Sequence, residues 1–102
     1  MSYQYIFEPR AQEEYEIAVQ WYLDRSLLAT QDFISSVDEA LALICEHPDR
    51  WKNLYKNYFE FGMRKFPFHI IYTIDTENKL IVIFSIYHQQ RNPKKKYKRK
   101  KP

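Results

Sequence analysis

The spacing of the apolar residues changes its period at Pro48, and this change constrains the fold more than any other feature of the chain. Before Pro48, apolar side chains recur every three or four residues, as they do along one face of an amphipathic helix. After Pro48 they alternate or run together over short stretches, which is typical of strands. A helical part followed by a strand-rich part indicates an α+β domain in which helices cover a sheet.

Two helices are predicted before Pro48. The first begins at Pro9, because a proline in the first turn of a helix loses no helical hydrogen bond, and it ends near residues 24–26. The second spans residues 27–46, since proline cannot continue it. The short link between them predicts an antiparallel helix hairpin. The apolar stripe of the first helix is predicted to contain Ala11, Tyr15, Ala18 and Tyr22, widened by Ile17 and Trp21.

Strands are predicted on both sides of the helix pair. Residues 3–7 form a short aromatic strand before it, and residues 63–66, 68–75 and 80–87 form strands after it, with residues 76–79 as a hairpin loop. The last strand is apolar on both faces, which fits a central strand. We therefore expect an N-terminal strand and an antiparallel helix hairpin packed on one face of a small, mainly antiparallel sheet.

The composition excludes several classes of site. Gly62 is the single glycine, so no glycine-rich loop can cradle a nucleotide phosphate. Cys45 is the single cysteine, which excludes an internal disulfide and a cysteine-built zinc site. We expect neither a metal nor a cofactor. The start of the chain lacks the pattern of a signal peptide, and no apolar run is long enough to cross a bilayer, so we expect a cytoplasmic protein without a membrane partner.

The charge is divided sharply along the chain. Residues 1–90 carry 8 of the 16 basic residues and all 13 acidic residues, whereas residues 91–102 carry the other 8 basic residues. We expect a folded domain over residues 1–93 and a flexible basic tail over residues 94–102. Such a tail favours an anionic partner that meets one region of the protein. A solubilising, disordered end is the other interpretation of the same composition.

Two segments resemble motifs of the RelE/ParE toxin superfamily. Residues 62–72, GMRKFPFHIIY, are similar to its R-x-F-P-[YF]-x-I-x-Y segment. Residues 88–93, HQQRNP, resemble its H-x-x-R-x-P close, particularly on the ParE side. The aromatic first strand and the two helices also match in order, so the resemblance covers nearly the whole chain and is closer to the ParE branch.

This resemblance implies the toxin of a bacterial type II toxin–antitoxin pair, with growth inhibition or plasmid stabilisation as its role. ParE-like members poison DNA gyrase, whereas RelE-like members cut messenger RNA in the ribosome. Both are silenced by a small antitoxin that wraps over the toxin. We expect a cognate antitoxin as partner and gyrase as target, with the ribosome and its messenger RNA as the alternative target. A homodimer or a toxin–antitoxin hetero-oligomer is compatible with either.

The nuclease alternative needs a base, an acid and a group that stabilises charge on the phosphate. Arg64 can clamp phosphate oxygens, and His88, which titrates near neutral pH, can act as base or acid. Arg91 follows at the same edge. The resemblance maps the basic group and C-terminal tyrosine of RelE-like nucleases onto Arg64, Arg91 and Tyr97, with Tyr87 as the other tyrosine candidate.

Each of these residues also has a purely structural interpretation. Arg64 can pair with Glu60 or Asp75, and His88 can cap its strand by bonding to the backbone. A third function is open as well, a non-toxic module that binds RNA or a partner through its tail. The residues predicted to contact a partner or nucleic acid are Lys52, Lys56, Arg64, Arg91, Lys94, Lys95, Lys96, Lys98 and Arg99.

Overall fold

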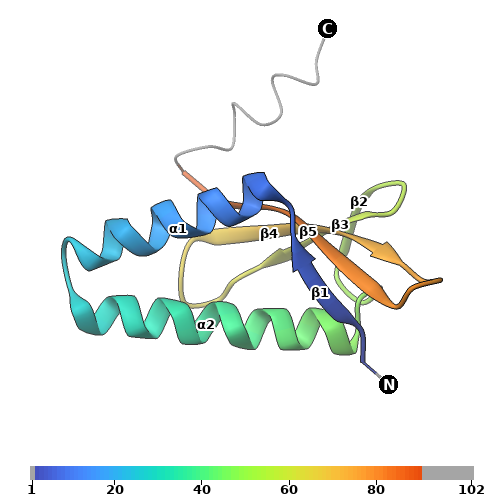
Figure 1. Ribbon diagram of the computed structural model, residues 1–102, viewed down its shortest axis with the longest axis horizontal. Coiled ribbons are helices and arrows are strands. Elements are labelled where there is room, and N and C mark those ends of the chain that lie inside the picture. Colours follow the sequence, from blue (N-terminus) through green and yellow to red (C-terminus); the bar gives the residue numbers. More distant parts are fainter. Residues whose placement is uncertain (1, 91–102) are drawn as a thin grey trace, which may run out of the picture.

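The computed structural model describes residues 2–90 (Figure 1). Two helices follow a first strand, and four further strands complete the domain. In chain order the elements are β1 (Gln4–Phe7), α1 (Pro9–Leu23), α2 (Leu27–Glu46), β2 (Lys52–Tyr55), β3 (Tyr58–Gly62), β4 (Phe68–Asp75) and β5 (Leu80–His88).

The domain has two layers, a sheet and a pair of antiparallel helices that covers one of its faces (Figure 1). The strand order is β1-β5-β4-β3-β2. β1 runs parallel to β5, and every other neighbouring pair is antiparallel. The predicted fold class is thereby confirmed, and β5 has the inner position expected of a strand that is apolar on both faces.

Local signals fix the helix ends where the sequence places them. α1 has Pro9 in its first turn and ends before Asp24. α2 is capped by Ser26, whose hydroxyl accepts a hydrogen bond of 3.0 Å from the amide of Ala29. It ends at Glu46, two residues before Pro48. The predicted bounds of both helices are confirmed.

An aromatic cluster joins the two helices to the sheet. Phe33 of α2 is fully buried. Its ring centroid lies 5.0 Å from those of Tyr22 and Phe68, 5.3 Å from that of Phe66 and 6.1 Å from that of Tyr15. Ring pairs at these separations add attraction beyond the burial of apolar area. This cluster is therefore the main packing contact between the helix hairpin and one end of the sheet.

The stripe of α1 is narrower than the sequence predicts. Ala11 and Ala18 are buried, and their small side chains form the line of contact with the sheet. Ile17 and Trp21 remain 62% and 37% exposed. Their predicted membership of the buried stripe is wrong, because they line an open pocket beside β5 to which no residue of α2 contributes.

The predicted strand over residues 63–66 is also wrong. The strand is β3, which ends at Gly62, and the following residues form the connection to β4. The amide of Phe68 donates to the carbonyl of Phe66 at 2.8 Å, and the amide of Met63 donates to the carbonyl of Phe68 at 3.0 Å. Pro67 has no amide proton for a sheet ladder, so the chain turns here instead of extending.

Tyr72 of β4 gives the domain a predictable response to alkaline pH. Its side chain is fully buried, and its hydroxyl donates to the carbonyl of Pro48. Burial, reinforced by the nearby Asp49 carboxylate, raises the pKa of Tyr72 well above its ordinary value of 10.0. Above about pH 10 the unfolded chain therefore loses this proton while the folded chain keeps it. The contribution of Tyr72 to the free energy of unfolding is therefore constant below pH 10 and falls as the pH rises further.

We expect the free energy of unfolding to fall by up to about 1.4 kcal/mol per pH unit above pH 10 through this group. Tyr72→Phe should cost about 1 kcal/mol near pH 7, since it removes one buried hydrogen bond. It should also reduce the fall in stability at alkaline pH, leaving the parts due to Tyr15 and Cys45, whose pKa values are likewise raised by burial. Urea unfolding of both proteins between pH 7 and 11 measures this. If the free energy of unfolding falls equally steeply with pH in the two proteins, the effect does not come from Tyr72.

Candidate functional site

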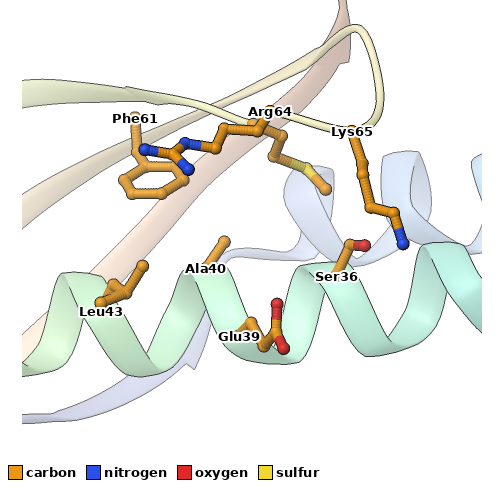
Figure 2. A pocket seen from close by; sticks show the side chains of 8 residues that line it. Ser36, Glu39, Ala40, Leu43, Phe61, Arg64 and Lys65 are labelled. Atoms are coloured by element: carbon orange, nitrogen blue, oxygen red, sulfur yellow. The ribbon is translucent and has the colours of Figure 1, made fainter.

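The structure places the two described catalytic candidates in different pockets. Arg64 lies in the connection between β3 and β4 and lines a pocket against α2 (Figure 2). The expectation that it lies on a strand is wrong. His88 is the last residue of β5, as predicted, and lines a pocket against α1. Arg91 and Tyr97 lie outside the described residues, so the proposed catalytic group stays a prediction.

The surroundings of His88 combine polar and apolar groups. Its Nδ1 accepts a hydrogen bond of 3.0 Å from the amide of Gln90, and its ring meets that of Phe68 edge-on at 5.1 Å. The pocket beside it, of about 160 Å³, is also lined by Trp21 and Glu14. Because Nδ1 accepts a hydrogen bond, the proton of the neutral ring is on Nε2. The backbone contact matches the structural interpretation of this residue, and the catalytic one remains untested.

A polar cluster lies on the sheet face away from the helices. Glu60 alternates with the core residues Phe59 and Phe61 along β3, so its side chain points to the other face. It is 8% exposed. One carboxylate oxygen accepts a hydrogen bond of 2.8 Å from the hydroxyl of Tyr87 and lies 3.1 Å from Nδ1 of His69.

Further contacts order this cluster. The His69 ring stacks on the Tyr87 ring at 5.4 Å, and its Nε2 lies 3.1 Å from the side-chain oxygen of Gln89. Gly62, the register partner of His69, leaves room for this ring, because a Cβ there would lie 3.3 Å from Cε1 of His69. The three strands β3, β4 and β5 therefore hold a carboxylate, an imidazole and a phenol together. A carboxylate at this place disfavours a bound phosphodiester.

This cluster is not predicted from the sequence, which does not single out His69 and indicates Glu60 only as a partner for Arg64. The available signal was the acid between two phenylalanines in a strand, where alternation indicates the non-core face. In the structure Glu60 accepts a hydrogen bond from Tyr87, and Asp75 accepts hydrogen bonds from the side chain and the backbone amide of Asn78. Within residues 2–90, neither carboxylate pairs with Arg64.

The two predicted binding lysines within residues 2–90 lie in different places. Lys52 begins β2 and is the register partner of Glu60, so it shares the sheet face of the polar cluster. Lys56 lies in the β2–β3 turn with a left-handed φ of 49°, where its ammonium lies 5.3 Å from the ring of Tyr55. The remaining predicted contacts lie outside the described residues: Arg91, Lys94, Lys95, Lys96, Lys98 and Arg99.

Two features are absent from residues 2–90. No three histidine, cysteine, aspartate or glutamate side chains in this part of the chain are grouped so as to hold a metal ion. None of its helices combines the length and the apolar character needed to cross a membrane.

Comparison with known proteins decides the family. Residues 5–93 match the family described as "ParE toxin of type II toxin-antitoxin system, parDE". The chain belongs to this ParE toxin family. The resemblance to the RelE/ParE superfamily, and to its ParE branch, is thereby confirmed. None of the curated proteins is significantly similar in sequence.

Solved structures of this superfamily share the fold. The chromosomal ParDE system of P. aeruginosa contains a chain with a TM-score of 0.70 and 10% identity, covering 85% of this chain and 96% of that one. A mutant of the E. coli toxin RelE in the free state has a TM-score of 0.65 and 15% identity, covering 97% and 98%. The RelBE2 complex of Mycobacterium tuberculosis gives 0.59 and 20%, covering 86% and 92%. At these identities the likeness shows the fold alone.

Proposed function

We propose that this ParE-family toxin stops bacterial growth by binding DNA gyrase and that a cognate antitoxin neutralises it. The family match over residues 5–93 supports the toxin role. Similar folds occur in structures described as toxin–antitoxin systems, which supports an antitoxin as partner. Gyrase is a cytoplasmic target, so the protein is expected to act there.

The observation that favours gyrase binding over RNA cleavage is the carboxylate on the open sheet face. Glu60 is buried between Tyr87 and His69, and its negative charge disfavours binding of a phosphodiester on this face of the sheet. Arg64 and His88 line pockets against different helices. Groups that act together on one phosphodiester must lie within a few ångströms of its reacting atoms.

Two assays of the purified protein test this proposal. The proposal predicts inhibition of gyrase supercoiling and no new message ends in a cell-free translation reaction. In a host bacterium, induction should stop growth, and co-expression of the antitoxin should restore it. Normal growth with good soluble expression would contradict the toxin role. Message cleavage without inhibition of supercoiling would favour the ribosome-dependent nuclease.

The two alternatives have their own signatures. If the protein cleaves RNA, Arg64→Ala and His88→Ala should each abolish cleavage, and their full activity would remove these residues from the site. If it is a non-toxic binding module, its binding to anionic polymers should be salt-sensitive and should vanish when residues 94–102 are deleted.

A further inference from the structure

We propose that the pocket between α2 and the β3–β4 connection is a docking site for an amphipathic segment of the antitoxin. This proposal rests on the proposed function for the identity of the partner. The pocket, called the α2 pocket below, has a volume of about 290 Å³. Its lining residues are Ser36, Glu39, Ala40, Leu43, Phe61, Met63, Arg64 and Lys65.

The floor of the α2 pocket is apolar and comes from both layers of the domain. Ala40 of α2 and Phe61 of β3 are 3% and 8% exposed, and they close its base. Leu43 lies one turn further along α2 and is 40% exposed, although both residues that follow it are buried. Figure 2 shows Ala40 and Leu43 facing Phe61 across the pocket. An apolar side chain placed here would cover Leu43 and remove it from water.

The size of the α2 pocket favours an anchoring side chain over a small-molecule cofactor. Pockets for drug-sized ligands occupy about 300–1,000 Å³ and enclose most of the ligand. The α2 pocket is at the lower limit of that range and is open along its length between a helix and a loop. Protein interfaces commonly use one or a few large side chains inserted into such a depression.

The rims of the α2 pocket carry opposite charges. On the strand side, the guanidinium of exposed Arg64 extends above Phe61 (Figure 2), and within residues 2–90 it forms no ion pair. Its neighbour Lys65 is already paired with Asp32 of α2 at 2.9 Å. On the helix side, Glu39 is exposed and also has no ion pair within the described chain. The two rims therefore offer one cation and one anion to a partner.

This charge pattern defines the chemistry of the occupant. A large apolar side chain would fill the floor, a carboxylate would face Arg64, and a basic side chain would face Glu39. Arg64 is suited to this role because its planar fork binds a carboxylate through two parallel hydrogen bonds. Opposite charges on the two rims also allow only one orientation of the bound segment.

The test compares five full-length variants in their affinity for the purified antitoxin, by isothermal titration calorimetry. The antitoxin used is the protein whose co-expression abolishes growth arrest by the wild-type toxin. Leu43→Lys and Arg64→Glu alter the floor and rim of the α2 pocket. Leu28→Lys is the matched control for Leu43, on the same helix and 77% exposed. Lys79→Glu is the control for the charge reversal, in the β4–β5 turn.

We expect each pocket variant to weaken binding about 10- to 100-fold, as the loss of an anchor or a charge-assisted hydrogen bond does. Both controls should stay within about twofold of wild type. Circular dichroism should give the same spectrum for the wild type and all five variants. Glu39→Arg should also weaken binding, and this distinguishes an oriented amphipathic segment from a simple acidic one.

Wild-type affinity in correctly folded Leu43→Lys and Arg64→Glu would overturn the docking site and leave the proposed function standing. If the wild-type chain does not inhibit growth, the proposed function is overturned, and the docking site with it.

The same variants also test two other occupants of the α2 pocket. A wild-type dimer in light scattering that Leu43→Lys makes monomeric, with antitoxin binding unchanged, would assign the pocket to a second copy. Single-stranded RNA binding that only Arg64→Glu removes, again with antitoxin binding unchanged, would equally contradict the proposal.

Discussion

Replacing Phe33 with alanine is expected to lower the free energy of unfolding by about 3–5 kcal/mol. Phe33 is fully buried, and four aromatic rings surround it from α1, from the β3–β4 connection and from the start of β4. Its removal leaves a cavity where the helix hairpin meets the sheet, and closely packed rings cannot collapse to fill it. Domains of this size are stable by only about 5–15 kcal/mol, so the loss is a large share of the total.

Urea unfolding followed by circular dichroism measures this loss. Leu28→Ala is the matched control, because Leu28 is on the same helix but 77% exposed. It should change the free energy of unfolding by no more than about 0.5 kcal/mol. Phe33→Leu keeps an apolar side chain in place and should cost less than Phe33→Ala. Equal changes for Phe33→Ala and Leu28→Ala would contradict the central role of the aromatic cluster.

Glu14→Ala is expected to have the second-largest effect, a loss of about 2–3 kcal/mol. One oxygen of Glu14 accepts hydrogen bonds of 2.8 Å from the hydroxyl of Ser85 and from the amide of Ile86. These bonds join α1 to β5 where the pairing of β5 with β4 skips a residue, between Ile83 and Ser85. Alanine would leave the buried amide of Ile86 without this acceptor.

Two variants separate this contact from the general effect of removing an acid. Glu13→Ala removes an exposed carboxylate from the adjacent position and should change stability by no more than about 0.5 kcal/mol. Glu14→Gln keeps an acceptor oxygen and should lose less than Glu14→Ala, about 1 kcal/mol. Urea unfolding followed by circular dichroism measures both changes. If Glu13→Ala and Glu14→Ala destabilise equally, the link between α1 and β5 is not what stabilises this region.

The candidate site shows where sequence-based prediction ends. The motif that contains Arg64 is evident in the sequence, but the sequence predicts a strand over its residues 63–66. Pro67 and the turn that it ends place Arg64 beside α2 instead. The cluster of Glu60, His69 and Tyr87 is spread over three strands, so only the register of the sheet brings it together. No local pattern contains that register.

By itself, the sequence determined the helices, the longer strands, the α+β class and the superfamily. These depend on short-range causes: Pro9 begins α1, Ser26 caps α2, Pro48 follows its end, and a change of apolar period separates helices from strands. Only the tertiary structure decided that β1 lies parallel beside β5, that Glu60 is buried against Tyr87 and that Arg64 faces α2. Each of these joins residues far apart in the chain, and such contacts are fixed by packing and strand register, which the local sequence does not specify.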